Sequence, residues 1–213
     1  MSDLKKEIVF FGSYLVVLKN LVDKLRVALV VVERGKVDPE LISFCRENQL
    51  CILEINSLDE LPGEQDFLSC IGVVASFGLI FKQRHLDRFA ALYNFHPGCV
   101  YSNRGRHPLP SAILRGNSTM AISLHRIIDE KIDCGGLLLR VELPISYADS
   151  YGSNYSRLLS ALPYMTSYLV NCLSVGDVPE LNLIEQENSY FPPLPRDVLK
   201  SIIEADDLMS WKP

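Results

Sequence analysis

The chain has 213 residues, of which 48% are hydrophobic and 22% are charged, which is typical of one globular domain and not of a disordered segment. Its formal net charge of −5 argues against nucleic acid as the main partner, because binding to phosphates depends on clustered Lys and Arg. The six cysteines follow neither a disulfide nor a zinc spacing, which favours reduced thiols in a cytoplasmic protein. No apolar run approaches the ~20 residues that a membrane span needs, so no membrane partner is expected.

The first half of the chain alternates between strand and helix patterns. Glu7–Phe11 is a compact apolar run, and the helical spacing that follows it continues to Leu25. Val27–Val32 is a β-branched run of the kind found in strands that are covered on both faces. Asp38-Pro39 has the residues that open a helix, which we expect to reach about Asn48. Further elements are predicted as strands at Cys51–Ile55, Ile71–Ser76 and Leu92–Phe95 and as a helical piece near Arg84–Ala90.

This alternation predicts an α/β fold, namely a Rossmann-like, mostly parallel sheet with helices on both faces. The later elements that we expect are a helical segment around Ser111–Arg115, a strand that runs into His125, a strand at Leu137–Ile145, a helix at Ser150–Cys172, a last strand at Leu181–Glu185 and a weak helix at Asp197–Asp207. Pro163 should kink or split the long helix. We expect a main domain over residues 1–178 and a C-terminal extension, part strand and part extended tail, over residues 179–213.

Two kinds of ligand site are weakly supported. The first strand–helix turn has only Gly12 and lacks the three-glycine pattern that brings a dinucleotide pyrophosphate against the backbone. Glu33 ends the second strand where a ribose-binding acid would lie, but a single acid there is more often simply solvated. A metal site built from His96, Cys99 and His107 lacks the second ligand pair that structural zinc needs, so no metal is expected.

A stronger group consists of an amide, an imidazole and a carboxylate. Asn94 and His96 are two residues apart in a predicted strand, so their side chains point to the same side. Pro97-Gly98 ends that strand, which places both side chains at the carboxyl edge, where open α/β sheets bind ligands. Asp133 precedes a glycine-rich turn. Each residue alone is explained by a turn or a satisfied polar contact, but together they favour a reaction centre.

The motifs of this stretch are, in order, Asn94-Phe95-His96-Pro97-Gly98, Asn103-Arg104-Gly105 with Pro108, Gly116, His125-Arg126 and Asp133-Cys134-Gly135. As an ordered set they closely resemble the folate-dependent formyltransferase family, whose members carry an Asn-x-His-Pro strand end, an Arg-Gly loop and an Asp-x-Gly turn. The resemblance covers roughly Glu7 to Ile145, with a fainter match around Tyr190–Asp197. It implies that residues 1–178 form a catalytic domain, with 10-formyltetrahydrofolate as donor and a primary amine as acceptor.

The resemblance implies Asn94, His96 and Asp133 as the catalytic residues. Attack of an amine on the formyl carbon puts negative charge on an oxygen, to which the Asn94 amide and a protonated His96 can donate. One such donor is typically worth ~3 kcal/mol of the barrier. Asp133 would favour the imidazolium form of His96 and could accept the proton that the amine loses, directly or through water.

The resemblance also implies binding residues for both substrates. The pterin would lie between the loop 76–80 and the loop 128–132, held largely by backbone groups. The cofactor-binding residues would be Ser76, Phe77, Gly78, Ile80, Ile128, Asp129 and Ile132. For Phe77, Leu79 and Ile80, an ordinary core position is the alternative. The residues expected to bind the acceptor are Asn103, Arg104, Gly105 and Tyr190, with Trp211 as a possible second aromatic surface for a nucleotide base.

The acceptor is predicted by comparing branches of the family. Enzymes that act on initiator tRNA carry a further C-terminal domain and a basic face, and this chain is acidic and ends at 213. The glycinamide ribonucleotide enzyme has a glycine- and serine-rich phosphate cradle, where this chain has Gly12-Ser13-Tyr14. The formyltetrahydrofolate hydrolases add an N-terminal regulatory domain, whereas here the first strand begins at Glu7, and the loop Asn103–Pro108 resembles that of the sugar N-formyltransferases. We therefore expect a sugar N-formyltransferase that modifies a nucleotide-linked amino sugar, namely a dTDP-linked one, for bacterial surface polysaccharide.

The acceptor-side loop departs from the family, two alternative functions stand beside the expected one, and the resemblance also bears on the assembly. The loop Cys99–Ser102 lacks the Leu-Pro that the family commonly has there, so we expect the acceptor-side loop to have a different shape. The alternatives are glycinamide ribonucleotide formyltransferase and a non-catalytic folate- or nucleotide-binding module. The resemblance further implies a homodimer with a contact in the C-terminal extension.

Overall fold

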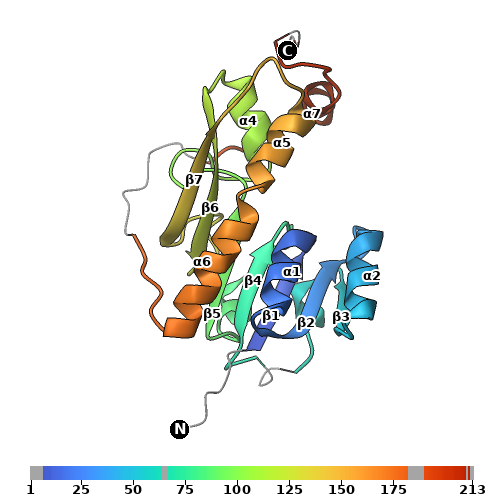
Figure 1. Cartoon of the computed structure of the whole chain (residues 1–213), viewed down its shortest axis with the longest axis vertical. Helices are drawn as coiled ribbons and strands as arrows, with labels where there is room; N and C mark the ends of the chain where they lie inside the picture. The colour runs from blue at the N-terminus through green and yellow to red at the C-terminus, as the bar shows by residue number, and fades with distance from the viewer. Residues whose placement is uncertain (1–6, 64–66, 182–189, 210, 212–213) are drawn as a thin grey trace.

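A seven-stranded sheet forms the centre of the computed structural model, which describes residues 7–63, 67–181, 190–209 and 211 (Figure 1). The strands are β1 (Glu7–Gly12), β2 (Arg26–Glu33), β3 (Ile52–Ile55), β4 (Ile71–Ala75), β5 (Ala91–His96), β6 (Thr119–Ile127) and β7 (Leu137–Pro144). Their order is β3-β2-β1-β4-β5-β6-β7. The first five strands are parallel, whereas β6 and β7 pair antiparallel. The prediction of a mostly parallel α/β sheet is confirmed.

The two faces of the sheet are covered unequally. One face packs against the helices α1 (Leu15–Val22), α2 (Pro39–Glu47) and α6 (Leu162–Val175). The other face packs against the short 3-10 helix η1 (Leu58–Glu60), the four-residue helix α3 (Gln83–Leu86) and buried phenylalanines in the loops. Consecutive residues of the strands serve opposite faces, since Phe10 belongs to the first cluster and Phe11 to the second. Both faces are therefore buried, as the continuous apolar strands predicted.

The long C-terminal helix is divided, as Pro163 predicted. Helix α5 spans Tyr151–Leu159, and α6 begins at Leu162 with Pro163 in its first turn, where the missing N–H of proline is tolerated. By length and composition the stretch Tyr151–Val175 is apolar enough to cross a membrane, unlike what the sequence analysis expected. In this structure its apolar side packs against the sheet, where Met165 and Leu169 are fully buried.

The strands around β5 bring distant residues to one edge of the sheet. Strand β5 pairs in parallel with β4 and antiparallel with β6, and this second pairing places Asn94 directly opposite His125. The segment between β6 and β7 then returns to the carboxyl end of β5 and carries Asp133. Helix α4 (Pro108–Leu114) follows the loop that leaves β5.

The C-terminal part of the chain packs against the main domain. Helix α7 (Arg196–Ile203) is shorter than predicted, and its Ile202 is fully buried in the larger core cluster. Leu181 forms an isolated bridge with Leu137, and the rest of the predicted strand Leu181–Glu185 lies outside the described residues. Tyr190 forms a second bridge with Arg104, so the described tail reaches the loop after β5.

Candidate functional site

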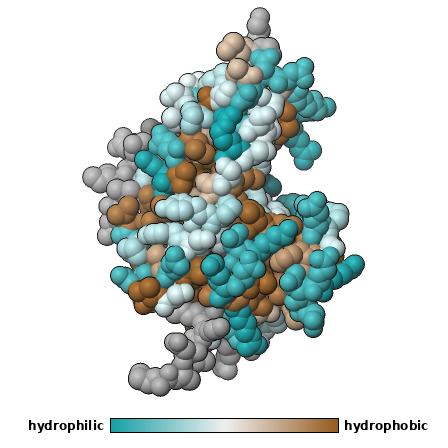
Figure 2. All heavy atoms as spheres, viewed as in Figure 1, coloured by the Kyte–Doolittle hydropathy of each residue, from teal (hydrophilic) through white to brown (hydrophobic). Residues whose placement is uncertain are grey.

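A cavity of about 550 Å³ lies at the carboxyl ends of β1, β4 and β5. Its walls include Tyr14, just before α1, and Tyr155, on α5. Figure 2 shows the molecule hollowed on the right-hand side, between the end that carries α5 and α7 and the part that carries α1 and α2. Asn94, His96 and Asp133 all line the cavity, so the structure brings the three predicted catalytic side chains together.

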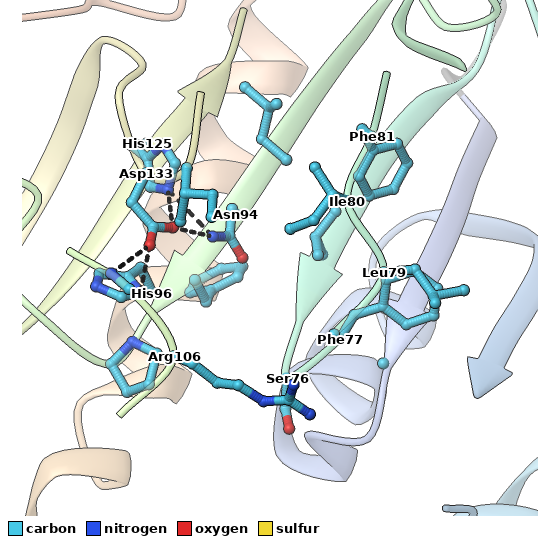
Figure 3. Close-up of a pocket in the computed structure, with 18 of the residues that line it drawn as sticks. Ser76, Phe77, Leu79, Ile80, Phe81, Asn94, His96, Arg106, His125 and Asp133 are labelled. Carbon is cyan, nitrogen blue, oxygen red and sulfur yellow. Dashed lines mark hydrogen bonds and ion pairs between the residues drawn. The ribbon is translucent and has the colours of Figure 1, made fainter. Parts of the chain in front are cut away.

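Asn94 and His96 both contact Asp133 (Figure 3). Asn94 donates from Nδ2 to Asp133 Oδ1 at 3.2 Å, and His96 Nδ1 lies 3.4 Å from Asp133 Oδ2. The backbone N–H of Gly105 also donates to Asp133 Oδ2, at 3.1 Å. Asp133 therefore lies at the centre of the group, where it accepts from Asn94 and from the loop after β5 and faces the imidazole of His96.

His125 is a fourth member of this group that the sequence analysis did not assign to the site. Its Nε2 lies 3.1 Å from Asn94 Nδ2 and 3.5 Å from Asp133 Oδ1, and its side chain is almost completely buried. The antiparallel register of β5 and β6 is what places it opposite Asn94. The signal that could have found it is the imidazole at the end of a predicted strand a few residues before Asp133.

These contacts determine which way the Asn94 amide faces. Its nitrogen has both Asp133 and His125 as partners, whereas rotating the amide by half a turn would put its oxygen against the Asp133 carboxylate. Within the described part of the chain, no residue donates to Asn94 Oδ1. The amide oxygen, not the amide nitrogen, is therefore the free group of Asn94, which differs from the donor role expected from the sequence.

The imidazole of His96 is held from both sides. Its Nε2 lies 3.1 Å from the backbone oxygen of Asn103, on the side of the ring away from Asp133. Gly98 makes room for the ring, because a Cβ atom there would lie 2.4 Å from His96 Nε2. Pro97-Gly98 therefore does more than end the strand, since the glycine lets the chain pass close against the imidazole.

Burial and charge set the protonation of the two central groups. Burial lowers the pKa of His96 below its usual value, although Asp133 and the Asn103 carbonyl act in the opposite direction. This net direction differs from the expected imidazolium form, because His96 is only 5% exposed. Burial alone would raise the pKa of Asp133, but His96, His125 and the Gly105 N–H outweigh it and lower that pKa to about 2.

The backbone is strained at two positions of the cavity wall. Ser76 and Asp133 have φ angles of 62° and 54°, values that residues with a Cβ atom rarely adopt. Both residues line the cavity. Such conformations persist only where the surrounding structure enforces them, and they are concentrated at functional sites.

The residues predicted to bind folate lie in the loops 76–80 and 128–132, which together are called the apolar arm of the cavity. All seven of them line it: Ser76, Phe77, Gly78, Ile80, Ile128, Asp129 and Ile132. Ile80 and Ile128 are 52% and 53% exposed, although they are large apolar side chains from two different loops. Phe77 and Leu79 also pack against the second core cluster, so the core interpretation holds for them in part.

Glu33 positions one wall of this arm. Its Oε1 accepts from the backbone N–H of Gly78 at 2.7 Å, and its other oxygen pairs with Lys36. Glu130, in the loop 128–132, accepts from the backbone N–H of Gln83 at 2.9 Å. Each acid anchors a loop of the arm, which gives Glu33 a structural contact that the dinucleotide hypothesis did not consider.

The four residues predicted to bind the acceptor are placed differently from one another. Gly105 and Tyr190 line the cavity. Asn103 is 7% exposed and donates from Nδ2 to the backbone oxygen of Pro108 at 2.6 Å, so it lies behind His96. Arg104 extends to the thiol of Cys134. Neither Asn103 nor Arg104 is among the described residues that line the cavity.

Trp211 and His107, which the sequence suggested as binding residues, make hydrogen bonds within the protein. Trp211 donates from Nε1 to Ser201 Oγ at 3.0 Å and packs against the larger core cluster. His107 Nδ1 accepts from the backbone N–H of Leu194 at 3.1 Å. Within the described residues, no three His, Cys, Asp or Glu side chains are grouped so that they could hold a metal ion.

No model of a known protein family matches this chain. The chain is similar to methionyl-tRNA formyltransferase of Pseudothermotoga lettingae, with 28% identity over 116 residues, which are 54% of this chain and 37% of that protein. It is 38% identical to methionyl-tRNA formyltransferase of Gluconobacter oxydans over 88 residues, which are 40% of this chain and 28% of that protein. The chain thus spans less than half the length of these curated relatives.

Several solved structures with the same architecture are of formyltransferases. WlaRD, a sugar 3N-formyltransferase solved in the presence of dTDP and 5-N-formyl-THF, gives a TM-score of 0.74 at 20% identity, covering 88% of this chain and 70% of that chain. The N-formyltransferase from Helicobacter canadensis, in complex with folinic acid and dTDP-3-aminofucose, gives 0.71 at 19% identity, with 89% and 71% covered. The chain has the formyltransferase fold.

The formyltransferase fold is shared by proteins that act on different acceptors. Phosphoribosylglycinamide formyltransferase from Streptococcus pneumoniae gives a TM-score of 0.67 at 16% identity, covering 80% of this chain and 99% of that chain. The comparison confirms the predicted architecture and agrees with the resemblance stated from the motifs. The choice of acceptor has to come from the site itself.

Proposed function

We propose that this protein is an N-formyltransferase that transfers a formyl group from 10-formyltetrahydrofolate to the amine of a nucleotide-linked amino sugar. The observation that carries the proposal is the convergence of Asn94, His96 and Asp133 in one cavity, beside an apolar arm formed by two loops. The formyltransferase fold supports it, since two solved proteins with this fold were crystallised with a folate and with dTDP or a dTDP-sugar.

The apolar arm fits the pterin of a folate. Ile80 and Ile128 are about half exposed in two loops that both line the cavity, and a flat ring bound against them would bury apolar side-chain surface. Removing apolar surface from water stabilises such a complex by ~25 cal/mol per Å². The positive φ of Ser76 holds the start of one loop in a fixed conformation, which favours recognition through backbone groups. When bound, the folate supplies the formyl group that is transferred.

The chain's own residues manage charge and protons during the transfer. Asn94 Oδ1 is free to accept a hydrogen bond from the incoming amine, which orients that amine for attack. His96 starts neutral, because burial lowers its pKa. His96 takes the proton that the amine loses when it attacks the formyl carbon, and the imidazolium stabilises the negative charge on the formyl oxygen. The bond between the formyl carbon and the folate nitrogen then breaks, and His96 returns the proton to that nitrogen. Asp133 stays ionised and holds both side chains in position.

The turn after β1 favours an amino sugar over glycinamide ribonucleotide. The backbone N–H groups of Ser13 and Tyr14 both face the carbonyl of Ala75, at 3.0 and 3.4 Å, so they are not free to cradle a phosphate. The hydroxyls of Tyr14 and Tyr155 lie 2.6 Å apart in the wall above this turn. Phenolic hydroxyls suit the hydroxyl groups of a sugar, since they both donate and accept hydrogen bonds.

The domain bounds, the homodimer and the cellular location that we propose rest on the resemblance to the formyltransferase family. Residues 1–178 would be the catalytic domain, and residues 179–213 an extension through which two copies form a homodimer. Modification of a nucleotide-linked sugar for bacterial surface polysaccharide would take place in the cytoplasm. Size-exclusion chromatography with light scattering tests the dimer, and a monomer at micromolar concentration would contradict it.

A mass-spectrometric turnover assay tests the function. The full chain is offered 10-formyltetrahydrofolate with a panel of dTDP- and UDP-amino sugars, glycinamide ribonucleotide and methionyl-tRNA. We expect one nucleotide sugar to gain a single formyl unit. Turnover of glycinamide ribonucleotide or of methionyl-tRNA instead would overturn the acceptor and keep the reaction. Binding of folate without turnover of any amine would favour a non-catalytic module.

Two alanine variants connect turnover with the site. Asn94→Ala and His96→Ala each remove a group that acts on the reacting atoms, so we expect turnover to fall by ~100- to 1,000-fold. Folate binding, measured by calorimetry, should be unchanged, because neither side chain belongs to the apolar arm. The exposed Asn48, at the end of α2, gives a matched Asn48→Ala control whose turnover should equal that of the unmodified chain. Normal turnover of the Asn94 variant would contradict the assigned centre.

A further inference from the structure

Arg106 is a cation in the wall of the cavity that the catalytic group does not use. It lies in the loop between β5 and α4 and is exposed. Figure 3 shows its side chain extending from the loop that carries it into the same cavity as His96 and Ser76. Within the described part of the chain, no carboxylate forms an ion pair with Arg106. By contrast, Arg126 pairs with Glu180.

The backbone on both sides of Arg106 is held in place. Gly105 donates its N–H to Asp133 Oδ2 at 3.1 Å. His107 accepts at Nδ1 from the backbone N–H of Leu194, also at 3.1 Å. The direction in which the Arg106 side chain leaves the loop is therefore set by its two neighbours. A guanidinium whose base is fixed in this way loses less conformational freedom when it binds a ligand.

The carboxylates of the cavity wall already have donors of their own. Glu33 accepts from Gly78 and pairs with Lys36, and Glu130 accepts from Gln83. Asp129 accepts from the backbone N–H of Lys131 at 2.9 Å. The positive charge of Arg106 is therefore left for a ligand, and a planar guanidinium is suited to the paired oxygens of a phosphate.

We propose that Arg106 binds a phosphate of the acceptor, and so selects acceptors that carry a nucleoside diphosphate. This inference rests on the proposed function and names the residue that recognises the anionic part of its second substrate. Recognition by a side chain fits the turn after β1, where Ser13 and Tyr14 direct their N–H groups to Ala75. The phosphate would lie beside Arg106, at the loop between β5 and α4.

Calorimetric binding of dTDP and of UDP tests the contact without requiring turnover. We expect the unmodified chain to bind a nucleoside diphosphate and Arg106→Gln to weaken this binding by roughly 10- to 100-fold, the usual worth of a charge-assisted hydrogen bond. Arg106→Lys should lose less, because it keeps the charge but not the planar fork. Arg46→Gln is the matched control, since Arg46 is exposed at the end of α2 and does not line the cavity. 5-Formyltetrahydrofolate should bind all four proteins equally.

The result separates this inference from the proposed function. If the chain formylates a nucleotide sugar, Arg106→Gln should raise KM for that sugar and leave kcat within a few-fold. An unchanged KM and an unchanged affinity for dTDP and UDP would overturn the role of Arg106 while the proposed function stands. If no amine is formylated, the proposed function fails, and loss of diphosphate binding in Arg106→Gln still supports the contact. Failure of the unmodified chain to bind either diphosphate would overturn it.

Discussion

At the scale of single residues, Asp133 is the group on which the site depends. It accepts from Asn94, faces His96 and receives the N–H of Gly105, while its own backbone has a positive φ. A carboxylate that is 10% exposed would lose its charge without such partners. The same contacts that keep it ionised also fix the orientation of the Asn94 amide. A change at Asp133 therefore alters charge and geometry together.

The lowered pKa of Asp133 predicts how folding stability depends on pH. Because the carboxyl has a pKa of about 2 in the folded chain and ~3.9 when unfolded, the unfolded state binds more protons between these values. Asp133 then contributes about 2 kcal/mol above pH ~5, and this contribution is lost as the pH falls from ~5 towards 2. We expect the free energy of unfolding in urea to fall less steeply below pH 5 in Asp133→Asn than in the unmodified chain. Parallel pH curves for the two proteins would contradict this.

The residues of the centre were predictable from the sequence, but their orientation was not. The spacing of Asn94 and His96 and the turn at Asp133 placed these residue types at one edge of the sheet. The direction of the amide and the part played by His125 depend on the register between β5 and β6, which brings together residues far apart in the chain. The protonation of His96 likewise depends on burial, which no local pattern reports.

At the scale of elements, the loop between β5 and α4 connects the centre to the tail. Arg104 O accepts from the backbone N–H of Phe191 at 3.0 Å, and the next residue, Gly105, donates to Asp133. Gly105 has a φ of 113°, and a Cβ atom there would lie 2.3 Å from the backbone oxygen of Phe191. Only glycine allows the loop to contact the carboxylate on one side and the tail on the other.

Gly105→Ala should therefore damage both stability and turnover. Gly116→Ala is a matched control, because Gly116 also has a positive φ, 69°, but a Cβ atom there meets nothing within 4 Å. We expect the control to lose about 1 kcal/mol of unfolding free energy, the cost of the left-handed backbone alone, with normal turnover. Gly105→Ala should lose more than the control and reduce turnover at least ~10-fold, since the donor to Asp133 moves. Equal losses in the two variants, measured by urea unfolding and by the formyl assay, would contradict this.

The periodicity of the sequence predicted the helices and strands, whereas the residues at which they begin and end depend on tertiary contacts. Strands β1 to β5 and helices α1 and α2 lie within a few residues of the predicted ranges. Helix α3 ends at Leu86, short of the predicted Ala90. The next residues turn so that Ala90 can donate its N–H to Cys70 at the entrance of β4. The antiparallel direction of β6 and β7 is a long-range pairing that the alternation of patterns did not contain.

At the scale of the whole molecule, the tail is part of the same core as the sheet. Ile202 on α7 is fully buried, and Leu208 is 3% exposed, in the cluster that also contains the buried residues of α1, α5 and α6. Tyr190 reaches the cavity from the start of this tail. The predicted extension at residues 179–213 is thus attached over a broad surface where the structure describes it.

Two adjacent residues of α7 test this attachment. Ile202→Ala removes a fully buried side chain, so we expect a loss of ~2–5 kcal/mol in the free energy of unfolding. Ile203→Ala is the control on the same helix, since Ile203 is 46% exposed and should lose less than ~1 kcal/mol. Both are measured by urea unfolding of the full chain. A similar small loss in both variants would show that α7 is not integral to the core.

The residues that line the cavity come from separate parts of the chain. Asn94, His96, His125 and Asp133 all come from one continuous block, β5 through the segment after β6, and Arg106 lies in the same block. Tyr14, Tyr155 and Tyr190 come instead from the turn after β1, from α5 and from the tail. A substitution at one of these three tyrosines therefore changes the wall of the cavity without changing the chain segment that holds the four polar side chains.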